Sequence, residues 1–428
     1  MIGKGLGFTH EHLLATAHEH ANLIIEENTT RVGMRAAGDA YPQIWARDAV
    51  IAGLGSALHS EAGGRDTLEN SLRSLTRHQS PLGRIPNNVH EINPDDGNSL
   101  VEDTMFAGAV DASLWYIIGH YILLCTQRNN RVARDNWKNL QNAHRWLMYQ
   151  DSNECGLLEV HESMDWADLF ANHYNSLLPN ILWYGANRTM ARIAACLESD
   201  PSEYIDRAED IRFKINQLLW VGPEVARNLN WIKANREEWL YSANLVDTVL
   251  GTRPYYLPYM AFRDYGDRLD TFGNLLAILL GVANDAQADR ILDYISSAGV
   301  DQPWPIKACW PVVTPGEKDW REYYRLFNLN IPHQYHNGGA WPFLGGFYVS
   351  ALVKRGRIDS ARHTLIQLAE MNFVGQGNSE WEFNEWFHGL SGKPMGHVKQ
   401  TWSAGMYIYA HEAVAQAACP VFNDQAGW

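Results

Sequence analysis

The sequence predicts an all-α fold, a barrel of six helical hairpins, (α/α)6, whose long loops form a cleft at one end. Apolar residues recur three and four positions apart in about twelve segments, the period of a helix with one buried face. Short polar connections join several segments into pairs, and longer connections separate the pairs. No linker or composition break interrupts the 428 residues, so residues 1–428 are interpreted as a single (α/α)6 barrel domain.

The predicted helices follow one another along the chain. They cover residues 12–25, 44–58, 67–76, 104–125, 133–148, 180–196, 204–219, 271–282, 286–295, 340–353, 360–371 and 401–415. Connections such as "HSEAGGRD" (59–66) and "KRGRIDS" (354–360) are short enough to form hairpins. A helical solenoid is the alternative architecture, but it requires a recurring motif, and none is found.

The long connections cover residues 79–103, 151–176, 298–339 and 373–399. Loops of this length in a compact domain are usually functional or disordered. These contain Trp, His, Pro and acidic residues rather than a disordered composition, so we expect them to form the cleft.

Composition excludes several classes of partner. A net charge of −14 argues against binding to nucleic acid or anionic membranes, which need positive charge. The five cysteines lack CxxC spacing, so neither a zinc site nor a disulfide framework is expected. No secretory signal or membrane-spanning stretch is visible, and we expect a cytoplasmic protein without metal or cofactor. The sequence leaves a homo-oligomer open.

Aromatic residues are abundant, with 17 Trp and 19 Tyr beside 17 His. A carbohydrate cleft would use them, because sugar faces lie flat on indole while hydroxyls bond to nearby polar groups. The His-rich stretch "HEHLLATAHEH" (10–20) lacks HExxH spacing and is interpreted as a solvated helix face rather than a metal site.

Two acidic clusters flanked by Trp lie in long loops more than two hundred residues apart. "MDWAD" (164–168) contains Asp165 and Asp168 around Trp166, and "WEFNEWFHG" (381–389) contains Glu382 and Glu385. Hydrolysis of a glycosidic bond needs two opposed carboxyl groups, and an aromatic neighbour raises the pKa of the one that acts as acid. The pattern predicts one catalytic group from each cluster without choosing within either pair.

Other polar residues near helix starts are candidates for binding sugar hydroxyls or walling the pocket. "IWARDAV" places two charged residues behind a Trp, and Asp111 and Trp115 share one face of an apolar helix, where an Asp must be satisfied by a partner. The candidates are Trp45, Arg47, Asp48, Asp111, Trp115, His336, Asn337, Trp341, Gln400 and Trp402.

The chain resembles a known family over nearly its whole length, from about residue 31 to 415. "PIKACWP" (305–311), "DWREYY" (319–324), "YHNGGAWPFLGG" (335–346) and "EWFHGLSGKPMGHVKQTWSAG" (385–405) run in the order seen in alkaline/neutral invertases. "IWARDAVIAGL" (44–54) and "VDASLWYII" (110–118) look like further motifs of that family.

This resemblance implies an inverting β-fructofuranosidase on an (α/α)6 barrel, with Asp165 as general acid and Glu385 as general base. The family's Glu-containing stretch after the acid is replaced here by "NSLLPNILWYGA" (175–186), which puts the sugar specificity in question. "WARDAVIA", "RHQSPLGRIPNNV" (77–89) and "DASLW" also resemble the glucosidase domain of glycogen-debranching enzymes and related inverting α-glucosidases.

The sequence therefore predicts an inverting glycoside hydrolase that acts on a small carbohydrate, with sucrose as the first substrate and short α-glucosides as the alternative. A sugar epimerase or isomerase on the same barrel, which would use His pairs, is a rival from another class. A carbohydrate-binding protein without turnover is a third hypothesis.

Overall fold

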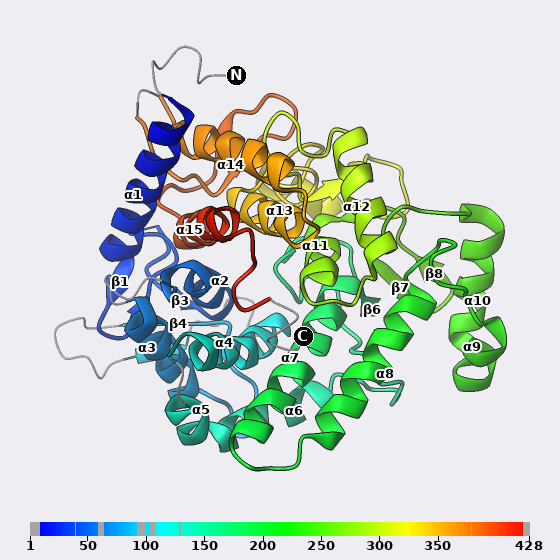
Figure 1. Cartoon of the computed structure of the whole chain (residues 1–428). Coiled ribbons are helices and arrows are strands. Elements are labelled where there is room, and N and C mark those ends of the chain that lie inside the picture. Colours follow the sequence, from blue (N-terminus) through cyan, green and yellow to red (C-terminus); the bar gives the residue numbers. More distant parts are fainter. Residues whose placement is uncertain are drawn as a thin grey trace.

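The computed structural model describes residues 9–38, 40–58, 64–91, 100–102, 108–127, 130–377 and 379–422. Six helices form a closed inner ring in which each packs on the next and the last packs on the first (Figure 1). In ring order they are α2 (Ala46–Ser56), α4 (Asp111–Gln127), α7 (Leu177–Cys196), α11 (Thr271–Leu279), α13 (Pro342–Lys354) and α15 (Thr401–Gln416).

An outer layer of helices covers the ring and completes the hairpins. It contains α1 (His10–Asn28), α3 (Gly64–Arg77), α5 (Arg131–Asp135) with α6 (Trp137–Met148), α8 (Ser202–Leu218), α12 (Asp285–Ser297) and α14 (Ile358–Phe373). The arrangement confirms the predicted all-α, (α/α)6 architecture.

The two layers differ in sequence because their helices have different surroundings. Every residue of α2 is buried, including the charged Arg47 and Asp48 of its first turn, and the rest of the helix is apolar or small on all sides. In α3, by contrast, Leu68, Leu72 and Leu75 face inward along one stripe. The ring closes tightly at α2 and α15, where a Cβ on Gly55 would overlap the carbonyl oxygen of Gly405.

Short antiparallel strands lie where the long loops enter the inner helices. β3 (Ile44–Trp45), β4 (Asn88–Glu91) and β5 (Leu100–Glu102) form one sheet, and β6 (Asn175–Ser176), β7 (Tyr259–Ala261) and β8 (Asp264–Tyr265) form another. Two-stranded pairs join β1 (Thr29–Thr30) to β2 (Gly33–Met34), β9 (Leu269–Asp270) to β10 (Cys309–Trp310), and β11 (Trp386–Phe387) to β12 (Pro394–Met395). Since β3, β6 and β9 lead directly into α2, α7 and α11, they fix the loops at the N-terminal ends of the ring.

The structure differs from the prediction in a few elements. The predicted helix 104–125 begins at Asp111, and its residues 104–107 lie outside the described part. Two short helices, α9 (Leu229–Asn235) and α10 (Glu237–Leu245), followed by a π-helical turn over Val246–Leu250, were not predicted. They project from the barrel beside β7 and β8 (Figure 1). Arg236, in extended conformation between α9 and α10, interrupts the helical period there.

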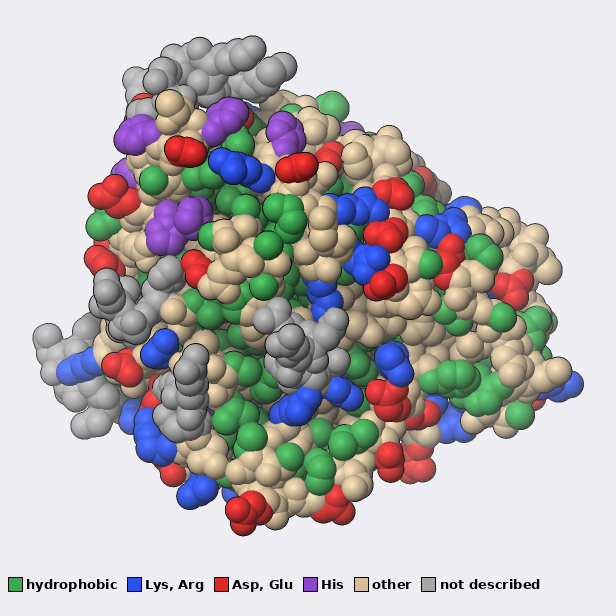
Figure 2. Space-filling view, viewed as in Figure 1, with side chains coloured by type: hydrophobic (Ala, Val, Ile, Leu, Met, Phe, Trp, Pro, Cys, Tyr) green, Lys and Arg blue, Asp and Glu red, His purple; other side chains and the backbone are tan. Residues whose placement is uncertain are grey.

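The surface carries charges of both signs, and His side chains gather over α1 (Figure 2). His20 stacks on Trp381 with ring centroids 5.0 Å apart, so part of this stretch packs against a loop rather than facing solvent. Within the described residues, no group of three or more His, Cys, Asp or Glu is arranged to hold a metal ion. No described helix is both long and apolar enough to cross a membrane.

Candidate active site

The predicted site residues come together where the inner helices begin. Arg47 and Asp48 lie in the first turn of α2, and Asp111 is the first residue of α4. His336 lies in the loop before α13, and Gln400 is the N-cap of α15. Loops 161–171 and 381–389 add the two acidic clusters, so side chains from five distant parts of the sequence meet at one end of the barrel.

Asp165 is buried, with 6% of its surface exposed, and its Oδ1 accepts a hydrogen bond from the Ala167 backbone N–H at 2.9 Å. Burial, together with the nearby Asp111 and Asp270, raises the pKa of Asp165 to about 8, although the Ala167 N–H and Arg47 oppose the shift. A carboxyl group with this pKa is protonated at neutral pH and can donate a proton.

Glu385 is the buried member of the second cluster. Its Oε2 accepts a hydrogen bond from the His397 backbone N–H at 3.1 Å. Burial raises its pKa to about 8, with further contributions from Asp48 and Asp168. Glu382 is only partly buried, and its Oε2 accepts a hydrogen bond from the Gln376 backbone N–H at 2.7 Å, which holds its own loop.

A charged cluster lies close to both acids. Nη1 of Arg47 donates to Oδ2 of Asp111 at 2.7 Å, and Nε of Arg47 lies 3.8 Å from Oδ2 of Asp48. Burial raises the pKa of Asp48 to about 6 and that of Asp168 to about 7, although Arg47 lowers both. His336 lies with Nε2 3.7 Å from Oδ1 of Asp168, and burial together with Arg47 lowers its pKa well below 6.5, so its ring is neutral.

Many of these side chains have polar atoms available for a ligand. Buried polar groups are nearly always hydrogen-bonded, because burial without a partner costs free energy. Within the described part of the chain, no partner is found for one or more buried side-chain atoms of Trp45, Arg47, Asp48, Asp111, Trp115, Asp168, His336, Gln400 and Trp402. Such a concentration of donors and acceptors suits a compact polyhydroxylated molecule such as a sugar.

The aromatic residues form a connected wall. The Trp166 ring lies 4.7 Å from His336 and 5.3 Å from Trp341, and Trp402 stacks on Phe343 at 4.2 Å between centroids. These Trp side chains are buried among one another, and Nε1 of Trp341 donates to the Tyr335 carbonyl at 3.0 Å. These rings therefore pack mainly against one another and offer few open indole faces for stacking.

Asn337 has contacts of a different kind. Its Oδ1 accepts from the Val313 N–H at 2.7 Å, and its Nδ2 donates to the carbonyl oxygens of Val313 and Asn330. The amide is therefore committed to holding two loop segments together. Trp115 stacks on Phe272, with ring centroids 6.0 Å apart.

The sequence reasoning missed three residues of the site. Tyr41 has a raised pKa because of burial and of the nearby Glu385, Asp48 and Asp168, which places its hydroxyl group beside the second acid. Tyr335 has similar neighbours, and Asp270 faces Asp165 with a pKa raised by burial to about 7. Asp270 caps α11 through the Gly273 N–H, so the sequence pattern indicated only a helix start.

Comparison with known proteins relates the chain to invertases. The family model for alkaline and neutral invertase matches residues 254–417. Alkaline/neutral invertase C, mitochondrial, of Arabidopsis thaliana is 26% identical over 231 residues, covering 49% of this chain and 33% of the relative. Neutral/alkaline invertase 1, mitochondrial, of Oryza sativa subsp. japonica is 32% identical over 146 residues, covering 33% and 22%. The matches span about a third or less of these relatives' length.

Solved structures show the same fold. A GH63 mannosylglycerate hydrolase from Thermus thermophilus superposes with a TM-score of 0.65 at 15% identity, over 92% of this chain and 99% of that one. A bacterial glucoamylase complexed with acarbose gives 0.60 at 15% identity, over 96% and 58%. The chain thus has the (α/α)6 fold of these glycosidases, and its similarity in sequence is to the alkaline and neutral invertases, as its motifs predicted.

Proposed function

We propose that the protein is an inverting glycoside hydrolase in which Asp165 is the general acid and Glu385 the general base. The observation that carries the proposal is the pair of buried carboxyl groups, each with a pKa raised to about 8, presented by separate loops to one charged cluster. The pKa of Asp165 is raised in part by Asp111 and Asp270, and that of Glu385 by Asp48 and Asp168, so the two acids interact with different carboxyl groups of the site.

In the proposed reaction, Asp165 protonates the glycosidic oxygen as the bond to the anomeric carbon breaks. Glu385 removes a proton from a water molecule that attacks that carbon from the opposite face. Arg47, Asp48, Asp111, Asp168, His336 and Gln400 bind hydroxyl groups through their available atoms, and Trp45, Trp166 and Trp402 bound the pocket. Asn337, Glu382, Trp115 and Trp341 act indirectly, by holding loops or supporting the wall.

The proposed substrate is sucrose, because the family model and the curated relatives are invertases. Short α-glucosides are the second candidate, because the sequence departs from the invertase pattern at residues 175–186. These residues form β6 and the buried start of α7. The relatives include mitochondrial and chloroplastic proteins, so the cytoplasmic location stays a prediction. All five cysteines are free, which fits a reducing compartment.

The test is proton NMR of the purified protein with sucrose, maltose, isomaltose and trehalose in separate tubes, followed from the first minutes. Glucose and fructose from sucrose alone would support the invertase, and release of β-glucose from an α-glucoside would move the protein to the glucosidases. In the maltose and isomaltose tubes, first-formed α-glucose from the non-reducing sugar, in excess of that released with the reducing end, would contradict inversion. If no disaccharide is cleaved and a free monosaccharide incubated with the protein gives a new anomeric signal, the protein is an epimerase and not a hydrolase.

A further inference from the structure

The loop that carries Asp165 is anchored to a segment far away in the sequence. Nε of Arg321 donates to Oε1 of Glu162 at 2.7 Å, and the Tyr323 hydroxyl donates to Oε2 of Glu162 at 2.8 Å. Glu162 therefore uses both carboxylate oxygens on residues of the 3₁₀-helical segment Glu322–Asn328 and the residue just before it. A carboxylate held by a guanidinium group and a phenol is fixed in position more firmly than by either alone.

The other end of the same loop has a second set of contacts. The Ala171 backbone N–H donates to the Tyr324 hydroxyl at 3.0 Å, and Nδ2 of Asn330 donates to the Leu169 carbonyl at 2.6 Å. The Phe170 and Tyr324 rings stack at 5.4 Å with an interplanar angle of 3°. The loop is thus held on both sides of Asp165 by one partner segment, residues 321–330.

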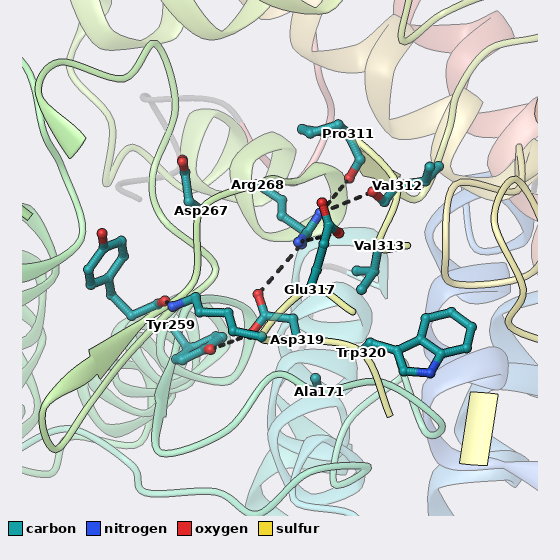
Figure 3. A network of polar contacts seen from close by, with 12 residues as sticks. Ala171, Tyr259, Asp267, Arg268, Pro311, Val312, Val313, Glu317, Asp319 and Trp320 are labelled. Carbon is teal, nitrogen blue, oxygen red and sulfur yellow. Dashed lines mark hydrogen bonds and ion pairs between the residues drawn. The ribbon is translucent and has the colours of Figure 1, made fainter. Parts of the chain in front are cut away.

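The partner segment is itself fixed to the barrel by a buried Arg (Figure 3). Nη1 of Arg268 donates to the carbonyl oxygens of Pro311 and Val312 at 3.2 Å each, and its Nε lies 3.6 Å from Oδ2 of Asp319. The Tyr259 hydroxyl, from β7, donates to Oδ1 of Asp319 at 2.6 Å. Asp319 therefore links β7 and β9 to the chain just before Arg321.

We propose that Glu162 and Asp319 are positioning residues for the general acid: together they fix the loop that keeps Asp165 in its buried place. The proposal rests on the proposed function for its catalytic meaning. Neither residue touches the groups that face Asp165, which are Asp111 from α4, Asp270 before α11 and Arg47 from α2. Their effect on the reaction passes through the loop backbone.

The physical consequence of loosening the loop is specific. Burial is the main reason that the pKa of Asp165 lies near 8, so water entering beside it would lower that pKa. The acid would then lose its proton at lower pH, and the alkaline limb of the rate profile would move down. Misplacement of an acid also lowers kcat, by roughly 10- to 100-fold for a displacement near 1 Å.

The chain provides a matched control. Glu224 accepts hydrogen bonds from Nη1 of Arg290 at 2.7 Å and from Nε1 of Trp220 at 3.1 Å, the same combination of an Arg and an aromatic donor, outside the site. Glu162→Gln and Glu224→Gln therefore remove equivalent charges. Asp319→Asn serves as a third variant, because it keeps an acceptor for Tyr259 and weakens the pairing with Arg268.

The experiment combines hydrogen exchange followed by mass spectrometry with rate profiles against pH for wild type and the three variants. We expect Glu162→Gln to speed exchange in peptides from residues 161–173, to lower kcat with KM little changed, and to move the alkaline limb to lower pH. Asp319→Asn should share these effects and Glu224→Gln should show none. A Glu162→Gln profile that superposes on that of Glu224→Gln would overturn the proposal.

The exchange data separate this proposal from the proposed function. If the wild type cleaves none of the sugars but Glu162→Gln and Asp319→Asn loosen residues 161–173 while Glu224→Gln does not, the anchor exists and the assignment of the hydrolase fails. If the wild type cleaves a sugar and exchange in residues 161–173 is the same in all proteins, the hydrolase stands and the positioning role fails. Glu162 is partly exposed, so its variant is expected to fold even if Asp319→Asn does not.

Discussion

Arg47 and Asp111 form a buried ion pair at the centre of the site, with Nη1 of Arg47 2.7 Å from Oδ2 of Asp111 and 6% and 0% of the two side chains exposed. Burial alone would lower the pKa of Arg47, but Asp111 and Asp48 raise it above its ordinary value, so the guanidinium group remains charged. The pair brings α2 and α4 together at the mouth of the barrel and sets one positive charge among several acids.

Replacing Arg47 with Met should be strongly destabilising. It leaves Asp111 as a buried charge without its partner, which costs about 3–5 kcal/mol of unfolding free energy. Urea unfolding of wild type and variant measures the change. Arg290→Met, which removes the partly exposed partner of Glu224, should cost about 1 kcal/mol or less, and equal losses in the two variants would contradict the importance of the buried pair.

Asp165→Asn and Glu385→Gln should each lower kcat by about 10²–10⁴-fold, the usual contribution of a positioned acid or base. Both changes preserve side-chain shape, so circular dichroism should be unchanged. The rates are measured by release of reducing sugar. A variant that keeps more than about a tenth of the wild-type rate shows that its residue does not have the assigned role.

Glu382→Gln is the companion variant that decides between the two glutamates. Glu382 accepts a hydrogen bond from the Gln376 backbone and shows no link to the charged cluster, so the rate should fall by less than about tenfold. A loss as large as that of Glu385→Gln would transfer the role of base to Glu382.

The rate should be greatest near pH 8. Catalysis needs Glu385 ionised and Asp165 protonated, and burial raises the pKa of each to about 8. Lowering the pH below 8 protonates Glu385, and raising it above 8 removes the proton from Asp165, so kcat/KM should fall on both sides. A profile that peaks near pH 4 to 5, where unperturbed carboxyl groups titrate, would contradict the buried site.

Asn337→Ala should affect stability before it affects sugar binding. The change leaves the Val313 N–H and the carbonyl oxygens of Val313 and Asn330 without this partner, at about 1–3 kcal/mol for each buried group that stays unpaired. Urea unfolding measures the loss. Unchanged stability together with a raised KM would instead make Asn337 a direct ligand of the sugar.

The helices of the barrel could be predicted because burial imposes a clear period on them. The stripe Leu68, Leu72 and Leu75 in α3 is visible in the sequence, and so is the continuous apolar character of the inner helices. The sheets could not be predicted, since strands such as Ile44–Trp45 have two residues and cannot show an alternating pattern. Arg236 breaks the period between α9 and α10, which hid both helices.

Candidate site residues could be named from the sequence where chemistry and position coincide. Asp165 and Glu385 stand out as acids beside Trp, but nothing in the letters distinguishes Glu385 from Glu382, because their burial depends on contacts such as the His397 N–H. Asp270 was missed because it also caps a helix, which explains its presence without a role in the site. Tyr41 was missed because tyrosine is a common residue type. Asn337 has the right chemistry for a sugar, yet its partners are backbone groups that only the fold brings near.

Asp165→Asn should stabilise the protein at alkaline pH although it removes activity. An unfolded Asp has a pKa near 3.9, whereas burial raises that of folded Asp165 to about 8. Between these values the folded state binds more protons than the unfolded state, so the wild type loses stability as pH rises from about 4 to 8. Asn carries no charge and avoids this loss. We therefore expect the unfolding free energy of the variant to exceed that of the wild type by a few kcal/mol at about pH 9, and this gap to close near pH 4. Urea unfolding at several pH values measures the gap. Asp200, exposed and with a pKa lowered by its hydrogen bonds to Ser202, supplies the control of opposite sign: relative to the wild type, Asp200→Asn should be less stable above about pH 4, and this gap should close as the pH falls below about 4. If the unfolding free energy of Asp165→Asn, relative to wild type, changed with pH in the same direction as that of Asp200→Asn, folding would not raise the pKa of Asp165.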